Sequence, residues 1–320
     1  MMSSWLKNWF QSQKQTRKFH PFWIVLVVMA TLAVGGVVWV ATYLFKVEEA
    51  PAVPAVVSSA TPGQDGAQSD NLPAIAKPSP LSVEQGGVFS PPDPEDIPSG
   101  EFGDVIRLGK NIFTDTQTYA SAYVGNGLNC VNCHLDAGRK PDSAPLWASF
   151  GMFPAYRDKN KQVNSYEDRL AGCFRFSMNG KAPPLGGKEM IALTSYSYWL
   201  AKGAPIGVAL KGRGYPELKQ PALAPDEVRG KGVFEANCAI CHGADGQGTL
   251  VKGRYVFPPL WGSQSFNAGA GMSKINNAAG FIQANMPLGQ GGSLNLQDAW
   301  DVAKFMTSHE RPADPRLAKK

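Results

Sequence analysis

The longest uninterrupted apolar stretch of the chain runs from Phe22 to Phe45 and contains no charged residue. At ~1.5 Å per residue, a helix of this length exceeds the ~30 Å hydrocarbon core of a bilayer, so the pattern predicts a transmembrane helix. Lysine and arginine residues precede the stretch and two glutamates follow it, which places the N-terminus in the cytoplasm. We therefore expect a cytoplasmic segment over residues 1–21, a single-pass anchor in the inner membrane over residues 22–45, and the remainder in the periplasm.

A cleaved signal peptide and a buried core helix are the alternatives for this stretch. The hydrophobic part of a signal peptide usually has ~7–15 residues, which is shorter than the run seen here. A core helix would need apolar partners, which the flanking segments do not offer. A membrane anchor therefore explains the pattern best.

Beyond the anchor, apolar side chains follow a helical period in two places. Over residues 193–200 and 299–306 they recur every three or four positions, which predicts an amphipathic helix in each segment. Sustained alternation of β-branched and polar residues is absent, so we expect no strands. Residues 46–98 are rich in Pro, Ala and Ser and have too little apolar content to fold, so we expect a disordered linker.

The part of the chain after this linker contains an internal repeat. Residues 109–113 (GKNIF) resemble residues 230–234 (GKGVF), and each copy leads into a Cys-x-x-Cys-His motif. Glycine and proline are frequent between the two copies, as in a connector. The repeat predicts two similar domains, over residues 99–210 and 226–320, joined by a connector over residues 211–225.

Composition and charge exclude several functional classes. The chain has 320 residues and a net charge of +5, without a block of like charges that would bind nucleic acid. We therefore expect no nucleic-acid partner. Five cysteines are too few for a disulfide scaffold, and an odd number cannot pair completely.

Each Cys-x-x-Cys-His motif is the attachment signature of a c-type haem. The two thiols form thioethers with the vinyl groups of one porphyrin, and the histidine ligates the iron. A thioredoxin-like motif has no use for the histidine, and a zinc site needs four ligands close together. We therefore expect two covalently bound haem c groups in an all-α fold with two class I cytochrome c-like domains in tandem. The attachment thiols are Cys130, Cys133, Cys238 and Cys241, and the proximal ligands are His134 and His242.

The second axial ligand of each haem is less closely defined by spacing. In the second domain Met286 lies in a glycine-rich loop typical of class I cytochromes c, and Met272 is the alternative. In the first domain Met178 has the equivalent offset, 44 residues after the proximal histidine, whereas Cys173 is the fifth cysteine and has no partner motif. Cys173 is either a thiolate ligand of the iron or a buried structural cysteine.

The neighbourhood of this cysteine is basic. Residues 139–188 contain nine Lys or Arg and four Asp or Glu residues, a local net charge of +5. A solvated basic face and compensation of haem propionates are the ordinary explanations. A cationic pocket beside an unusual haem ligand also suits a small dianion, which arginine holds through two parallel hydrogen bonds.

Longer stretches resemble the thiosulfate dehydrogenase family, dihaem c-type cytochromes that join two thiosulfates into tetrathionate. The resemblance covers roughly residues 100–316, and it includes NGLNCVNCHLDAGR (126–139), the segment 153–186, YWLAKGAPIG (198–207) and ANMPLG (284–289). These stretches are far more specific than the Cys-x-x-Cys-His motif alone.

The resemblance implies roles for individual residues. Cys173 would be the thiolate ligand of haem 1, Arg169 and Arg157 would bind substrate, and Met286 would ligate haem 2. Haem 2 would pass electrons to a soluble cytochrome c or a similar acceptor. The substrate site at haem 1 could also work in the reverse direction and reduce tetrathionate. Family members with a lysine before this methionine can exchange ligands there, which we do not expect here because the position is Asn285.

Two other functions are compatible with the motifs. A Sox-type thiosulfate-conjugating cytochrome also has a Cys-ligated haem, but it transfers sulfur to a carrier protein. A dihaem cytochrome that only transfers electrons would have two methionine ligands and no substrate. Formation of tetrathionate from thiosulfate would distinguish the three.

Overall fold

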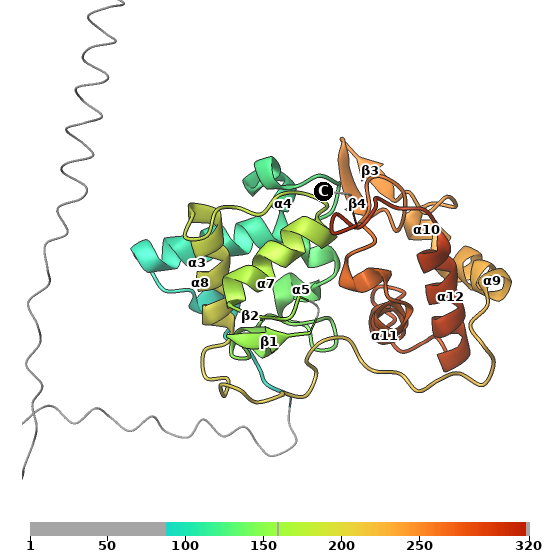
Figure 1. The fold of residues 1–320 in the computed structure, drawn as a ribbon, viewed down its shortest axis with the longest axis horizontal. Helices are drawn as coiled ribbons and strands as arrows, with labels where there is room; N and C mark the ends of the chain where they lie inside the picture. Colours follow the sequence, from blue (N-terminus) through green and yellow to red (C-terminus); the bar gives the residue numbers. More distant parts are fainter. Residues whose placement is uncertain (1–87, 159, 318–320) are drawn as a thin grey trace, which may run out of the picture. The chain divides into compact units, whose positions relative to one another are not determined.

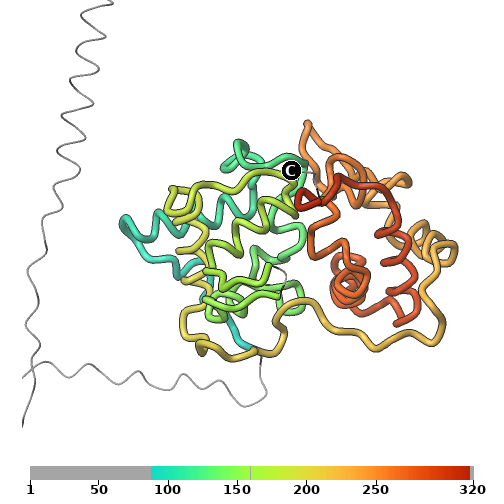
Figure 2. Tube along the Cα trace, in the orientation of Figure 1, coloured from blue at the N-terminus to red at the C-terminus, as the bar shows by residue number. Residues whose placement is uncertain are grey.

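The computed structural model describes residues 88–158 and 160–317, which all belong to one compact unit, Ala76–Lys320. This part of the chain is mostly helical (Figure 1, Figure 2). The predicted cytoplasmic segment, the predicted anchor over residues 22–45 and most of the predicted linker lie outside the described residues. Of the described helices, none combines the length and the apolar character that crossing a bilayer requires.

The helices of the described unit fall on either side of a long irregular segment. Before it lie α3 (Glu101–Thr114), α4 (Thr116–Tyr119), α5 (Leu135–Gly138), α6 (Trp147–Phe150), α7 (Tyr166–Gly172) and α8 (Lys188–Leu200). After it lie α9 (Glu227–Asn237), α10 (Ala239–His242), α11 (Ile275–Asn285) and α12 (Leu296–Ser308). Short turns are η1 (Pro94–Asp96), η2 (Ser121–Tyr123), η3 (Cys130–Asn132), η4 (Cys173–Ser177) and η5 (Gly271–Ser273). The two helices predicted from periodicity are confirmed as parts of α8 and α12.

The repeated glycine of the two sequence copies lies where two helices cross. In the first copy α3 packs against α8, and a Cβ atom at Gly109 would lie 2.1 Å from the carbonyl oxygen of Ala192. In the second copy α9 packs against α12, and a Cβ atom at Gly230 would lie 2.0 Å from the carbonyl oxygen of Asp301. Each crossing is therefore closer than any side chain permits, and the phenylalanine that ends each copy is buried beside it.

The expectation that the chain has no strands was wrong. Two antiparallel hairpins are formed by β1 (Ala155–Arg157) with β2 (Gln162–Asn164) and by β3 (Thr249–Val251) with β4 (Arg254–Phe257). Strands of this length are too short to show a sustained alternation of apolar and polar residues. The β3–β4 hairpin closes through Lys252 and Gly253, which both have positive φ, as a two-residue hairpin turn requires.

Hydrogen bonds join the residues around the two sequence copies directly. The Asn126 side chain is buried and donates through Nδ2 to the carbonyl of Ser265, 3.1 Å away. At the tip of the β3–β4 hairpin, Arg254 Nη1 lies 2.8 Å from a carboxylate oxygen of Asp115. The predicted domains of residues 99–210 and 226–320 therefore share an interface, and their exact boundaries stay predictions.

The segment between α8 and α9 contains no helix or strand, as the predicted connector requires. It lies against the second copy at several points. The ring of Tyr215 packs edge-on against Phe281, with ring centres 5.4 Å apart, and Trp300 Nε1 donates to the carbonyl of Lys219 at 3.0 Å. The connector is thus part of the folded unit rather than a free tether.

A buried carboxylate joins the first turn of α9 to α12. The Asp301 side chain is 1% exposed and accepts hydrogen bonds from Arg229 Nε (2.7 Å), from Arg229 Nη2 (2.9 Å) and from the backbone N–H of Asp226 (2.8 Å). Burial raises the pKa of the Asp301 carboxyl, but the hydrogen bonds from Arg229 and Asp226 outweigh this effect and lower the pKa below its usual value. The carboxylate is therefore charged and fully paired near neutral pH.

We predict opposite effects for two alanine substitutions in α9. Gly230→Ala should lower the free energy of unfolding by ~1–3 kcal/mol or more, because the new Cβ atom overlaps the α12 backbone. A Cβ atom at Gly232, two residues further along the same helix, would face open space. Gly232→Ala should therefore raise the free energy of unfolding by ~0.5–1 kcal/mol. Urea unfolding of the haem-loaded protein measures both values, and a stabilising Gly230→Ala would contradict the close crossing.

We also predict that the Asp301 pair stabilises the fold in a pH-dependent way. Because the folded-state pKa of Asp301 is lowered, its contribution is complete above the unfolded pKa of ~3.9 and is lost as the pH falls through the folded-state value. Asp301→Asn should cost ~1–2 kcal/mol at neutral pH, because the buried side chain at position 301 loses its charge, whereas the Arg229 side chain is 42% exposed and stays hydrated. The difference in the free energy of unfolding between variant and wild type should become smaller as the pH falls, which unfolding experiments in acid would measure. An unchanged difference at all pH values would refute the interpretation.

Candidate haem sites and the thiolate centre

In the first Cys-x-x-Cys-His motif a tight turn brings the two cysteines together. The turn η3 begins at Cys130, whose carbonyl accepts the backbone N–H groups of Cys133 (3.3 Å) and His134 (3.1 Å). Side chains three positions apart lie over each other in such a turn. Burial raises the pKa of both thiols to about 12.

The second motif has the same local structure. The carbonyl of Cys238 accepts the N–H groups of Cys241 (3.1 Å) and His242 (3.0 Å). Burial raises the pKa of the Cys238 thiol to about 11. In each half, one turn therefore holds two thiols and the histidine that follows them.

Both motif histidines are oriented by a backbone carbonyl. His134 Nδ1 lies 2.6 Å from the carbonyl oxygen of Ala144, and His242 Nδ1 lies 2.9 Å from that of Pro258. A carbonyl oxygen only accepts hydrogen bonds, so Nδ1 must carry the proton in each ring. The lone pair of Nε2 in His242 is then available to bind iron, whereas in His134 Nε2 is the nitrogen left to face the sulfur of Cys173.

The fifth cysteine lies at a change of helix type. Helix α7 begins after Ser165, which forms a capping box with Asp168, and passes at Cys173 into the π-helical turn η4. Turns of this kind inside helices occur frequently at functional sites. The wider turn follows directly on α7, so Cys173 lies one helical turn beyond Arg169.

Cys173 and Arg169 form a charged pair in a partly buried position. Arg169 Nη1 donates to Cys173 Sγ across 3.0 Å. Burial raises the pKa of the Cys173 thiol, but the charge of Arg169 and a hydrogen bond with His134 outweigh it and lower the pKa to about 6. The charge of Cys173 in turn raises the pKa of Arg169. The sulfur is therefore a thiolate at neutral pH, next to the imidazole of His134.

Of the remaining predicted residues of the first site, Met178 lies close along the chain, and its backbone N–H donates to the carbonyl of Cys173 at 3.0 Å. Met178 follows the π-helical turn, is 2% exposed and packs in the apolar core. Arg157 ends β1 on the surface, with its guanidinium 5.7 Å from the ring centre of Phe153. The Phe153 ring packs against that of Tyr166, whose pKa responds to burial and to the charges of Cys173 and Arg169. Arg157 thus connects to the thiolate centre through the rings of Phe153 and Tyr166.

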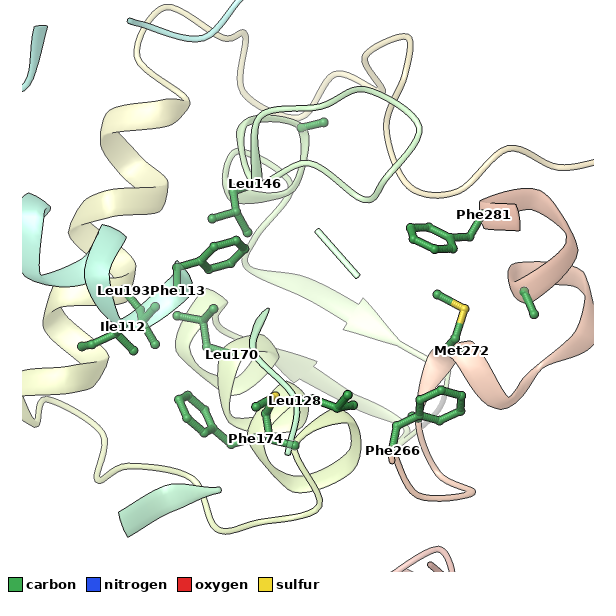
Figure 3. Close-up of a cluster of buried hydrophobic side chains, with 14 of the residues drawn as sticks. Ile112, Phe113, Leu128, Leu146, Leu170, Phe174, Leu193, Phe266, Met272 and Phe281 are labelled. Carbon is green, nitrogen blue, oxygen red and sulfur yellow. The ribbon is translucent and has the colours of Figure 1, made fainter. Parts of the chain in front are cut away.

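Two methionines lie near the second motif in the sequence. Met272, in η5, is buried with Phe266 and Phe281 in the same group of side chains (Figure 3). Met286 follows the last residue of α11 and is partly buried against the core. Met286 as ligand of haem 2, like Cys173 as ligand of haem 1, stays a prediction.

Apolar side chains surround both motifs. Figure 3 shows two groups of them, and those of the first group come from α3, α7, α8, η4 and the loops around the first motif. They are Ile112, Phe113, Leu128, Leu146, Leu170, Phe174 and Leu193, all buried. A porphyrin needs such a lining, so the residues present fit the implied haem groups.

Arg311 is a candidate for the second site that motif searching did not find. Its guanidinium lies 4.3 Å from the ring centre of Phe266, and it donates to the carbonyls of Leu260 (3.4 Å) and Met306 (2.8 Å). Burial lowers its pKa to about 10, and among the described residues no carboxylate is within ion-pair distance. A haem propionate is the anion that this position fits.

Tyr215 is a second residue that the sequence did not indicate. It belongs to the connector, and burial raises its pKa well above the usual value, with further effects from the charges of Cys133 and Arg169. The connector therefore contributes an aromatic side chain beside the thiolate centre. Nothing in the local sequence distinguishes Tyr215 from an ordinary linker residue.

Comparisons with known proteins agree with this geometry. The family model described as Cytochrome c matches residues 227–310. A thiosulfate dehydrogenase of Thiomonas intermedia (strain K12) is 58% identical over 235 residues, which cover 73% of this chain and 75% of the relative. One of Allochromatium vinosum is 42% identical over 221 residues, which cover 68% of this chain and 82% of the relative.

A solved structure is also similar. It is the as-isolated form of thiosulfate dehydrogenase (TsdBA) from Marichromatium purpuratum, with a TM-score of 0.71 and 46% identity over 73% of this chain. The match covers 52% of the solved chain, so the present chain spans about half of its length. At these identities and coverages, the chain belongs to the thiosulfate dehydrogenase family of c-type cytochrome enzymes.

Proposed function

We propose that this chain oxidises two thiosulfate dianions to one tetrathionate dianion at the centre formed by Cys173 and Arg169. The observation that carries the proposal is the 3.0 Å contact between the Arg169 guanidinium and the Cys173 sulfur beside His134. It combines a thiolate with a cation in a partly buried site, in a chain whose named relatives are thiosulfate dehydrogenases.

Two covalently attached haems belong to the proposal. Cys130, Cys133 and His134 would hold haem 1 and Cys238, Cys241 and His242 would hold haem 2, with Cys173 and Met286 as the second axial ligands. When bound, the haems supply two one-electron sites that pass electrons to a soluble cytochrome c or a similar acceptor.

Arg169 would hold the substrate. One guanidinium nitrogen contacts Cys173, which leaves further N–H donors for the sulfonate oxygens of thiosulfate. Two dianions repel each other, and a fixed cation in a partly dehydrated site reduces this repulsion. The same cation keeps the sulfur of Cys173 ionised and therefore ready to form a bond.

The sulfur chemistry can be written in two balanced steps on Cys173. The outer sulfur of one thiosulfate forms an S–S bond with Cys173 Sγ, and two electrons leave for the acceptor. A second thiosulfate then attacks the bound outer sulfur, the bond to Sγ breaks, tetrathionate departs and the Cys173 thiolate is restored. In the presence of an electron donor the same steps would run backwards as tetrathionate reduction.

We place the haem domains in the periplasm, held at the inner membrane by residues 22–45. The apolar stretch and the charges on either side of it support this location. A periplasmic position would give the thiolate centre access to external thiosulfate and to soluble cytochromes.

The haem content is the first prediction of the proposal. The denatured protein should have the mass of the chain plus two haem groups, because thioether bonds survive denaturation. Replacing both Cys130 and Cys133 by Ala should remove one haem, whereas Cys173→Gly should retain both. Mass spectrometry measures each value, and a single haem in the wild type would refute the two-site assignment.

Catalysis is the second prediction. Wild-type protein mixed with thiosulfate and ferricyanide should form tetrathionate, and Cys173→Gly should lower turnover by ~1000-fold or more, a loss of ~4 kcal/mol. Met178→Leu conserves the packing of a buried residue and should stay active. Activity retained in Cys173→Gly, or lost in Met178→Leu together with a changed haem spectrum, would contradict the assignment of Cys173.

The same mixture separates the proposal from its alternatives. An electron-transfer cytochrome would not be reduced by thiosulfate. A thiosulfate-conjugating cytochrome would form no tetrathionate without its carrier protein. Either result would remove the proposed reaction while leaving the haem assignment intact.

A further inference from the structure

The loop that follows the first haem motif has an unusual backbone. Asp142 and Ala144 both have positive φ, 60° and 51°, in the left-handed region that residues other than glycine rarely adopt. This conformation is strained for residues with a side chain, so the surrounding structure must hold both residues in place. The carbonyl of Ala144 is the group that orients His134, through the 2.6 Å hydrogen bond to Nδ1.

The connector holds one side of this loop. The N–H of Asp142 donates to the carbonyl of Gly212, and the N–H of Ala144 donates to that of Gly214, both at 2.7 Å. Two residues with positive φ are therefore fixed by backbone groups that lie more than sixty positions later in the chain. The loop does not hold this shape through its own contacts alone.

The other side of the loop is held by Asn285, the last residue of α11. Its side chain is fully buried, and Nδ2 donates to the carbonyls of Asp142 (3.0 Å) and Phe281 (3.1 Å). Because both partners only accept hydrogen bonds, the amide must point its nitrogen toward them. Its Oδ1 atom is buried and has no partner among the described residues, so these two bonds determine its orientation.

These contacts join the predicted iron ligands of the two haems. Met286 follows Asn285 directly in the chain, Asn285 bonds to Asp142, and Ala144 two residues later bonds to His134. The second motif has no counterpart of this arrangement. His242 bonds to the carbonyl of Pro258, which directly follows β4, so its support comes from its own half of the chain.

We propose that Asn285 is a positioning residue for His134: it fixes the carbonyl that hydrogen-bonds the proximal ligand of haem 1, although it belongs to the half of the chain that holds haem 2. The inference rests on the proposed attachment of haem at His134, but it does not depend on thiosulfate being the substrate. Asn285 thereby connects the loop that positions His134 to the chain segment that carries Met286.

The sign of the effect follows from the hydrogen bond at Nδ1. A short bond from Nδ1–H to a carbonyl makes the imidazole a stronger electron donor, which favours oxidised iron. Without Asn285, the Asp142–Ala144 loop can relax and this hydrogen bond should lengthen. The midpoint potential of haem 1 should therefore rise, whereas the ligands of haem 2 stay the same.

The test is a redox titration of the haem-loaded protein, followed by optical and electron paramagnetic resonance spectra that separate the two haems. Asn285→Leu has a similar volume without the amide, and Asn285→Ala removes the amide without adding a charge or a new donor. Asn277→Leu is the matched control, because Asn277 lies on the same helix and its Nδ2 bonds to Gly271, within the same half.

We expect both Asn285 variants to raise the midpoint potential of haem 1 and to shift its resonance signal, with haem 2 and the Asn277 control unchanged. An unchanged haem 1 in either correctly loaded variant, an equal shift in the control, or a shift of haem 2 alone would overturn the proposal. If Asn285→Leu fails to incorporate haem, the result for Asn285→Ala decides the question. The titration contains no thiosulfate, so a failed thiosulfate assay would leave its result valid.

Discussion

The arrangement of the first site depends on keeping one sulfur ionised in a partly buried place. Burial alone would protonate Cys173, and the guanidinium of Arg169 together with His134 reverses that tendency. This requires Arg169 to lie one turn before the sulfur, which α7 provides, and a wider turn at Cys173 that follows on it. Of the basic residues in this part of the sequence, Arg169 is the one that lowers the pKa of Cys173.

The two sequence copies share a framework and differ where their functions differ. In each, a glycine lets two helices cross closely, a tight turn pairs two thiols, and a carbonyl fixes the tautomer of the histidine. Only the first copy adds a charged thiolate pair. The second copy has instead Arg311, a partly buried arginine with neither a carboxylate nor a thiolate partner among the described residues. Duplication of a binding framework, followed by changes at single positions, accounts for both sites.

Short-range patterns predicted a good part of this structure, and long-range contacts account for what they missed. The two motifs, the helices at α8 and α12 and the irregular connector follow from local spacing, and the unpaired Cys173 could be recognised by counting. The hairpins were missed although Lys252 and Gly253 form a recognisable turn, because their strands are so short. The contacts of Asn285 and the burial of Arg311 join distant segments, so no local pattern contains them.

The hydrogen bonds from the connector to the loop of Asp142 and Ala144 also bear on how this architecture can change. A module whose metal-binding loop is held entirely by its own residues can be exchanged or fused as a separate unit. The first module borrows two carbonyl groups, from Gly212 and Gly214, and a side-chain amide from beyond its own boundary. Separated from the connector and from the second module, the first module would therefore lose three hydrogen-bonding groups that its loop depends on.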